Sequence, residues 1–355
     1  MQMIQYLSQK IRILSFLSII LVLYIHSGFH DYPNEIQGMT FNLKLQEAIS
    51  GMLGRCAVPL FYAISGYLFF LGLEDGKNKA DYGKLRIKIK KRFGTLFVPY
   101  IIACLFPAVF YFIMEQIPFC SKFVNGGCNF SDNFKKPLHE LIVFLYFDSG
   151  SGTPFAFHLW FLRDLIFIVI LSPALLWARS FIGKYVVCGI LFVMNFFTIS
   201  YIPIYGLFWF VFGLCFLDKL SNIKSVFIPV SFLLLCIVQM SYPSDWWKQF
   251  NIPIIVLGIV SIWTVYDNIC PKTFNINNHK FLMTVCSFTF FIYLFHEPTL
   301  NIVRKIIIIP FNHSSLGFAV SYLVSPWIFA FIWIIVGISF KRALPHIYTI
   351  CVGGR

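Results

Sequence analysis

The sequence has few charged residues, and this shortage decides the class of protein. Only 12% of its 355 residues are Asp, Glu, Lys or Arg, whereas a soluble domain usually carries about 25%. The mean hydropathy is +0.77, and 58% of the residues are hydrophobic. These values exclude a soluble globular protein. The apolar runs have helical length and do not alternate as barrel strands do, so they predict an all-α, polytopic membrane protein.

Acidic residues are scarcer than basic ones. The 15 Asp and Glu stand against 28 Lys and Arg, which gives a net charge of +13. Such a balance can indicate nucleic-acid binding, but the basic residues here gather at the ends of apolar runs, where the positive-inside rule places them. We therefore expect no nucleic-acid partner, and we interpret the charge as a topology signal that also contacts anionic membrane lipids.

Several motifs are absent. No CxxC pair and no His/Cys cluster with zinc spacing occurs, so we expect no metal. No GxSxG elbow occurs, which favours direct transfer chemistry over an acyl-enzyme. Without a glycine-rich phosphate motif, the basic segment 74–92 could hold a polyanion only by its charge. No transporter-like repeat interrupts a single predicted domain, residues 1–355.

The apolar runs predict about ten transmembrane helices. Their approximate ranges are 13–30, 50–73, 93–116, 157–177, 185–201, 204–218, 225–241, 252–267, 284–309 and 318–340. The long connection 117–155 contains a short amphipathic piece near 138–147. No small-residue cleavage site follows the first run, so we expect it to be a retained helix and not a signal peptide.

The basic residues also predict an orientation in the inner cell membrane. Both termini are expected in the cytoplasm, and Trp246 and Trp247 are expected to anchor an outer loop at the interface. The segments expected on the cytoplasmic side are 1–12, 74–92, 178–184, 219–224, 268–283 and 341–355.

Most of the ten cysteines lie in apolar runs and are expected to pack as small hydrophobic residues. Cys120 and Cys128 differ, because they flank a Gly-Gly sequence in an expected outer loop. They form a disulfide candidate if that compartment is oxidising, and two free thiols otherwise.

A set of ionisable residues lies at similar depth near the expected outer side of the membrane. Such residues usually face the bundle interior and mark functional sites, so we expect them to converge on one polar cavity. Purely structural interpretations stay open: a simple Arg163–Asp164 pair, an interfacial His158, and a structural kink at His296. The set comprises His26, Arg55, His158, Arg163, Asp164, His296 and Glu297.

His26 ends the first apolar run, and no acidic residue lies within one helical turn of it. Burial disfavours the imidazolium cation, so a buried histidine stays neutral and can act as a general base. It could deprotonate a hydroxyl for attack on an activated acyl group. Arg55 or Arg163 could stabilise the resulting oxyanion, and Glu297 or Asp164 could orient a histidine.

Five stretches, in this order, resemble the acyltransferase 3 family of integral membrane acyltransferases. They are LVLYIHSG around His26, RCAVPLFYAISGYLFF at Arg55–Phe70, KKRFGTLFVPY at Lys90–Tyr100, HLWFLRDLIFIVILSP at His158–Pro173 and SFTFFIYLFHEP at Ser287–Pro298.

The resemblance implies about ten helices, with acyl-CoA, usually acetyl-CoA, as a co-substrate that is not permanently bound. The acceptor would be a hydroxyl of an envelope glycan or lipid-linked sugar facing away from the cytoplasm. The family pattern also carries over to individual residues: His26 as catalytic base, Arg55, Arg163 and His296 in the catalytic site, Trp160 beside the substrate, and Lys91 and Arg92 near the CoA phosphates. To these we add Glu297 as a catalytic candidate and His158 and Asp164 as substrate-binding candidates.

One position departs from the family pattern. The family usually has an arginine eleven residues before the histidine, and this chain has Ser15 there. Arg12 lies about one turn earlier and could reach the same place, so we count it among the donor-binding candidates.

Two other functions remain open from the sequence. A transporter or flippase of an envelope lipid or sugar would use the same polar cavity and basic face. A lipid-linked glycosyltransferase would need carboxylates in a large outer loop, where 117–155 has few: Glu140, Asp132 and Asp148. The acceptor, the acyl chain and the oligomeric state are left undefined.

Overall fold

The computed structural model describes residues 2–29, 32–73, 81–118, 135–197, 202–220, 223–244, 247 and 250–354, which contain helices and no strand. The all-α prediction is therefore confirmed for this part of the chain. In chain order the helices are α1 (Gln2–His26), α2 (Pro33–Ile36), α3 (Thr40–Gln46), η1 (Glu47–Leu53), η2 (Gly54–Cys56), α4 (Ala57–Phe70), α5 (Tyr82–Arg92), η3 (Phe93–Phe97), α6 (Val98–Gln116), α9 (Leu138–Tyr146), η4 (Phe157–Leu159), α10 (Trp160–Ile182), α11 (Lys184–Met194), α12 (Ile204–Phe216), α13 (Phe227–Ser241), α15 (Asn251–Ile269), η5 (Ile276–Asn278), α16 (Lys280–Ser287), α17 (Thr289–Phe295), α18 (Thr299–Ile308), η6 (Ile309–Phe311), α19 (Ser315–Ala343) and α20 (Pro345–Cys351).

Six helical stretches within the described residues are long and apolar enough to cross a membrane, and a bent pair makes a seventh. Their outer faces carry large exposed apolar side chains, among them Ile170 and Trp177 of α10 and Phe331 of α19, as lipid contact requires. The helices α11, α12 and α13 are apolar but shorter. The structure thus agrees with a multi-pass membrane protein, whereas a count of ten spans stays a prediction.

Three predicted helix boundaries were wrong. The first helix begins at Gln2 and not near residue 13, so the expected polar lead is part of α1. The second stretch begins at Thr40 and runs to Phe70. Residues 82–92, expected in a basic loop, form α5 and continue into α6. Lysine and arginine have high helix propensity, so a basic segment beside an apolar run can extend its helix. The amphipathic piece in the long connection is confirmed as α9.

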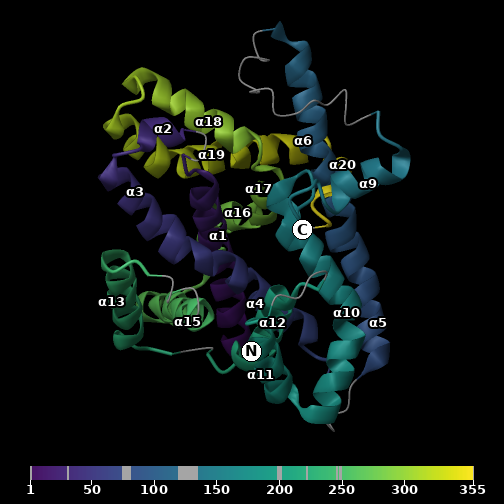
Figure 1. Cartoon of the computed structure of the whole chain (residues 1–355). Helices are drawn as coiled ribbons and strands as arrows, with labels where there is room; N and C mark the ends of the chain where they lie inside the picture. The colour runs from purple at the N-terminus through teal and green to yellow at the C-terminus, as the bar shows by residue number, and fades with distance from the viewer. Residues whose placement is uncertain are drawn as a thin grey trace.

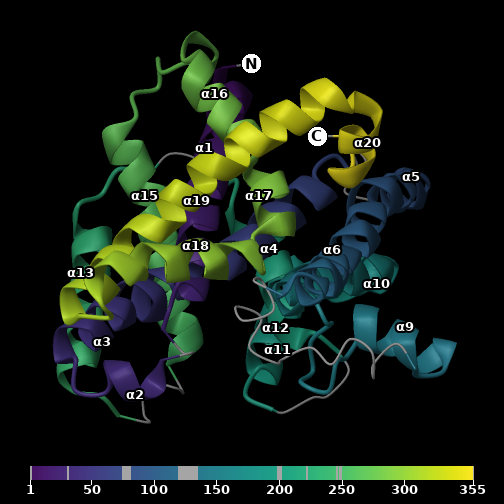
Figure 2. The same cartoon turned by 90° about the horizontal axis from the view of Figure 1, so that it is seen from above.

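Helix α1 lies inside the bundle and contacts helices from both halves of the chain. Its neighbours include α4, α15, α17 and α19. Helices α5, α6, α9 and α10 lie on one side of the molecule, and α3, α13 and α15 on the other (Figures 1 and 2). The central position of α1 brings segments from distant parts of the sequence to its end at His26.

Helices α4 and α12 pack very closely, and two glycines make this contact possible. A Cβ atom on Gly66 would collide with the backbone of Phe210, and one on Gly213 would collide with the backbone of Ala63. The two contacts are reciprocal, as in small-residue helix interfaces of membrane proteins. Backbone cannot move aside as a flexible side chain can, so both positions require glycine.

We expect Gly213→Ala to destabilise the bundle by about 1–3 kcal/mol, because an extra methyl group overpacks a rigid contact. The measurement is the midpoint of thermal unfolding in detergent, followed by fluorescence-detected size exclusion. Gly189→Ala is the matched control, since Gly189 also lies within a helix and a Cβ there would meet no atom within 4 Å. Equal midpoints for the two variants would contradict the packing argument.

The late apolar run, predicted as one helix over 284–309, is broken beside Pro298. The segments Lys280–Phe295 and Thr299–Phe311 meet at an angle of 95°. Proline has no backbone N–H to donate and clashes with the preceding turn. His296 and Glu297 therefore sit at the break, where side chains leave the regular helical surface.

Candidate functional site: a histidine cluster beside a cavity

Three histidines from distant parts of the chain meet in the bundle. His26 is the last residue of α1, His158 lies in η4 and His296 lies at the break between α17 and α18. The ring centroid of His296 lies 5.0 Å from that of His26 and 4.6 Å from that of His158. We call these residues the histidine cluster. Three of the residues predicted to share a cavity are therefore brought together.

Hydrogen bonds to backbone carbonyls orient the two innermost rings. His158 and His296 are 2% and 0% exposed. Nδ1 of His296 lies 2.8 Å from the carbonyl oxygen of Tyr293, and Nε2 of His158 lies 3.2 Å from that of Leu294. A carbonyl can only accept, so these nitrogens carry the hydrogens and donate.

The tautomers fixed in this way leave one acceptor nitrogen on each ring. Nε2 of His296 and Nδ1 of His158 are buried and have no hydrogen-bond partner in the described part of the chain. His26 is only half-buried, and its ring lies tilted against the exposed ring of Phe157, at 5.4 Å between centroids. The cluster can thus offer lone pairs to a hydroxyl group, and His26 is its most accessible member.

A cavity of about 540 Å³ extends along α1 away from the cluster. Arg12 lines it fourteen residues before His26, which is about 21 Å along the axis of a helix. Arg92 also lines it, whereas Lys91 does not and is exposed. The structure therefore places two of the three predicted donor-binding residues on one cavity, together with Ser15.

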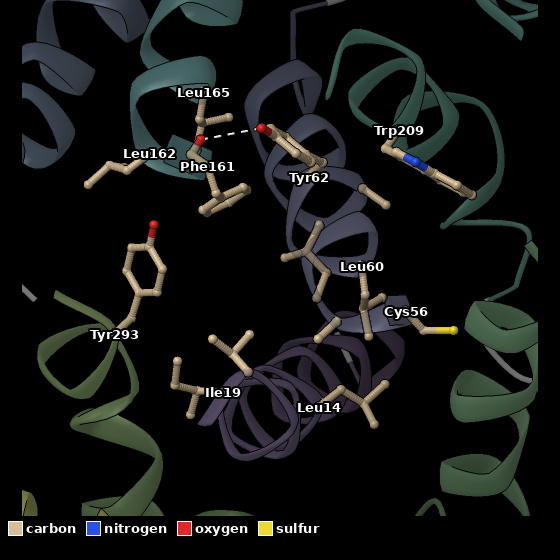
Figure 3. Close-up of a cluster of buried hydrophobic side chains, with 14 of the residues drawn as sticks. Leu14, Ile19, Cys56, Leu60, Tyr62, Phe161, Leu162, Leu165, Trp209 and Tyr293 are labelled. Atoms are coloured by element: carbon tan, nitrogen blue, oxygen red, sulfur yellow. Dashed lines mark hydrogen bonds between the residues drawn. The ribbon is translucent and has the colours of Figure 1, made fainter. Parts of the chain in front are cut away.

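The remaining lining of this cavity is mostly apolar, and Tyr293 connects the cavity to the histidine cluster. Phe161, Leu162 and Leu165 of α10 face Tyr293 of α17 across the gap beside α1 (Figure 3). The Tyr293 hydroxyl donates to the carbonyl of His158 at 3.3 Å, and the Tyr293 carbonyl accepts from His296. Tyr293 is thus a wall shared by the cavity and the cluster.

Arg163 and Asp164 pair with each other and hold a loop. Their side chains lie 2.9 Å apart, and Arg163 also donates to the carbonyls of Phe147 and Gly152. The same loop is closed by Asp148, whose carboxylate accepts from the backbone of Gly150 and Gly152; these bonds hold the pKa of Asp148 below its usual value. These contacts match the simple helix-end pair left open above, and none of them reaches a histidine.

Arg55 lies in a different pocket. Its guanidinium donates to Oε1 of Gln239 in α13 at 2.8 Å and touches the sulfur of Met52, so its contacts do not include the histidine cluster. Glu297, by contrast, is buried directly after His296. Trp160 is half-buried and packs against the core two residues after His158.

Cys120 and Cys128 lie outside the described residues, so the disulfide stays a prediction. Among the described residues, no group of three or more His, Cys, Asp or Glu side chains is arranged to hold a metal ion.

Arg304 was not among the predicted site residues, yet it holds the end of α1. Arg304 is 3% exposed, donates to the carbonyl of Gly28 and to Oδ1 of Asn301, and lies over the ring of Phe29. Because Gly28 follows His26 by two residues, Arg304 positions the chain where it leaves α1. The signal was available: an arginine inside the apolar run at 302–309 is an ionisable residue in a membrane segment.

A second missed feature is a buried ion pair at the other end of α1. Lys10 was expected in a solvated lead, but it is 0% exposed, pairs with Asp267 of α15 at 2.7 Å and lies over the ring of Trp263. The hydroxyl of Tyr6 donates to the other oxygen of Asp267. Lys10 is therefore a link between α1 and α15, not a topology signal.

The fold and the site together define a multi-pass helical membrane protein with a histidine cluster next to a cavity that shares Tyr293 with it. Comparison with known families agrees: the family model described as an acyltransferase domain (Acyl_transf_3) matches residues 10–340. The chain therefore belongs to the acyltransferase 3 family, as the motifs predicted. Searches of the curated proteins and of the solved structures each found no match.

Proposed function

We propose that this membrane acyltransferase moves an acetyl group from acetyl-CoA to a hydroxyl of an extracytoplasmic glycan or lipid-linked sugar. The observation that carries the proposal is the position of Tyr293, which lines the cavity of Arg12 and Arg92 and forms hydrogen bonds with His158 and His296 of the histidine cluster. A donor that is anionic at one end and reactive at the other fits this arrangement.

The donor would bind with its phosphates near Arg12 and Arg92 and its arm along the apolar lining. Guanidinium groups bind phosphate oxygens through paired, charge-assisted hydrogen bonds. The apolar walls of Phe161, Leu162 and Leu165 would exclude water from the thioester. The arm would then present its carbonyl carbon beside Tyr293, within reach of the cluster.

The acceptor hydroxyl would meet His26 from the opposite end. His26 accepts the hydroxyl proton while the oxygen attacks the thioester carbonyl, and a tetrahedral oxyanion forms. The intermediate collapses as the C–S bond breaks, and the imidazolium returns the proton to the departing sulfur. The ester and free CoA-SH leave, and His26 is neutral again. His296 and His158 surround this transfer, and Glu297 is placed beside them.

The proposed orientation sets the Arg12 end of α1 in the cytoplasm and the His26 end toward the outside. The basic residues of α5 support it, since they lie at the start of a span whose other end is outside under the positive-inside rule. With α11, α12 and α13 counted as short spans, the chain crosses the inner membrane about ten times and both termini are cytoplasmic.

The test uses the full-length protein purified in detergent, [14C]acetyl-CoA, and a total glycan extract from cells that lack the protein. We expect saturable transfer of label into the extract, as an ester that mild alkali releases. A transporter or flippase would neither transfer nor release the acetyl group. If the label stays on CoA in the presence of the extract, the proposed reaction is wrong.

A further inference from the structure

A second pocket lies where the end of α13 and the start of α15 meet η1 and η2. It has a volume of about 390 Å³, and its walls come from η1 and η2, the end of α13, the connection that follows α13, and the start of α15. We call it the Arg55 pocket. Its lining residues are Glu47, Arg55, Gln239, Pro243, Ser244, Trp247 and Asn251.

The lining combines every kind of hydrogen-bonding group with one aromatic ring. Arg55 only donates, Glu47 only accepts, and Gln239 and Asn251 do both. Nε of Arg55 is buried with no hydrogen-bond partner among the described residues. One cation and one anion balance each other, so the pocket suits a neutral ligand with many hydroxyl groups better than a phosphate or an ion.

The pocket is also close to the reacting end of α1. Gly54, the neighbour of Arg55, packs so tightly against Ile25 that a Cβ on it would lie 2.9 Å from the Ile25 side chain. Ile25 directly precedes His26. The Arg55 pocket therefore lies near the end of α1 that carries His26, whereas the Arg12 and Arg92 cavity extends toward the other end.

We propose that the Arg55 pocket binds a sugar unit of the acceptor and holds its chain while a neighbouring hydroxyl reaches His26; this inference rests on the proposed O-acyl transfer. Sugar hydroxyls donate and accept in turn, as Gln239 and Asn251 do, and the apolar face of a sugar ring can lie against Trp247. Arg55 then contributes to acceptor binding and not to the oxyanion, because its guanidinium is bonded to Gln239.

The experiment measures transfer from [14C]acetyl-CoA at increasing concentrations of the same glycan extract, with Gln239→Ala and Asn251→Ala in the purified full-length chain. Each change removes hydrogen bonds to the sugar, so we expect the half-saturating extract concentration to rise about tenfold, or more if Arg55 is also disturbed. The half-saturating acetyl-CoA concentration and the rate at saturating extract should stay within about twofold, since uniform binding affects KM alone.

Gln116→Ala is the matched control, because Gln116 is an exposed glutamine at the end of α6, on the side of the bundle away from α13 (Figure 1). An unchanged half-saturating extract concentration in both pocket variants would overturn the inference and leave the proposed function intact. A lower maximal transfer rate with an unchanged half-saturating extract concentration would also overturn the inference. That result would instead assign Arg55 a role in the chemical step. If the wild-type protein transfers no acetyl group, both the proposed function and this inference are wrong.

Unchanged acetyl-CoA saturation also serves as the folding check for each variant. Should Gln239→Ala elute as aggregate on size exclusion, Asn251→Ala decides the question, because it changes a different helix.

Discussion

His26→Ala is expected to lower acetyl transfer by about 10²- to 10⁴-fold, the usual contribution of a positioned general base. Without the imidazole, the acceptor hydroxyl would have to lose its proton to water. The apolar wall of the cavity excludes water, so this replacement base is scarce. His26 ends α1 and is only half-buried, so the protein should still fold. The measurement is the initial rate with [14C]acetyl-CoA and the glycan extract, at equal protein level.

His139→Ala is the control for this change, since His139 on α9 is 81% exposed. A His26→Gln variant separates shape from basicity, because glutamine can hydrogen bond but cannot take the proton; it should be as inactive as the alanine variant. Activity near the wild-type value in His26→Ala would transfer the base role to the acceptor nitrogen of His296 or His158.

Arg92→Ala is expected to raise the half-saturating acetyl-CoA concentration by about 10- to 100-fold, with a much smaller effect on the rate at saturation. A hydrogen bond to a charged group is worth about 1.5–3 kcal/mol, and a phosphate bound to Arg92 at the cavity wall would lose such bonds. Arg12→Ala should act in the same direction but less strongly, because Arg12 is exposed and screened by solvent.

Lys90→Ala is the control for the charge change alone: Lys90 lies two residues before Arg92, is exposed and does not line the cavity. Equal effects of Lys90→Ala and Arg92→Ala would mean that the donor responds to the general basic field and not to a built site. An unchanged acetyl-CoA saturation in Arg92→Ala would remove the cavity from donor binding.

The sequence was sufficient for the fold class and for the histidine cluster. Apolar runs report the cost of exposing backbone to lipid, so they identify membrane helices without tertiary information. His26, His158 and His296 could be selected because each is an ionisable or polar group within or beside such a run. Their meeting at one point then follows from similar depth in the bilayer.

Depth alone does not say which way a side chain points around its helix. Arg55, Arg163 and the histidines have similar expected depth, yet Arg163 holds the 147–153 loop and Arg55 turns to Gln239. The direction depends on which helix packs beside which, and that information is spread over contacts distant in sequence. The same reason hid the Lys10–Asp267 pair, whose members are 257 residues apart.

The predictions of the helix boundaries were wrong for a different reason. A hydropathy window detects the membrane part of a helix but not its polar extensions, and α1 and α5 both continue through charged residues that have high helix propensity. Arg12 became a cavity residue only because α1 begins ten residues before it, at Gln2.

Helix α1 has a mechanical consequence for donor choice. It carries Arg12 and His26 on one helix with a fixed rise per residue. The buried Lys10–Asp267 pair opposes a lengthwise shift of this helix, since a buried charge left without its partner costs about 3–5 kcal/mol. The helix therefore keeps a constant distance between Arg12 and His26. Under the proposed function, the distance from the phosphates to the thioester carbonyl of the donor must match this Arg12–His26 distance. A shorter or longer donor would place another atom beside the imidazole of His26.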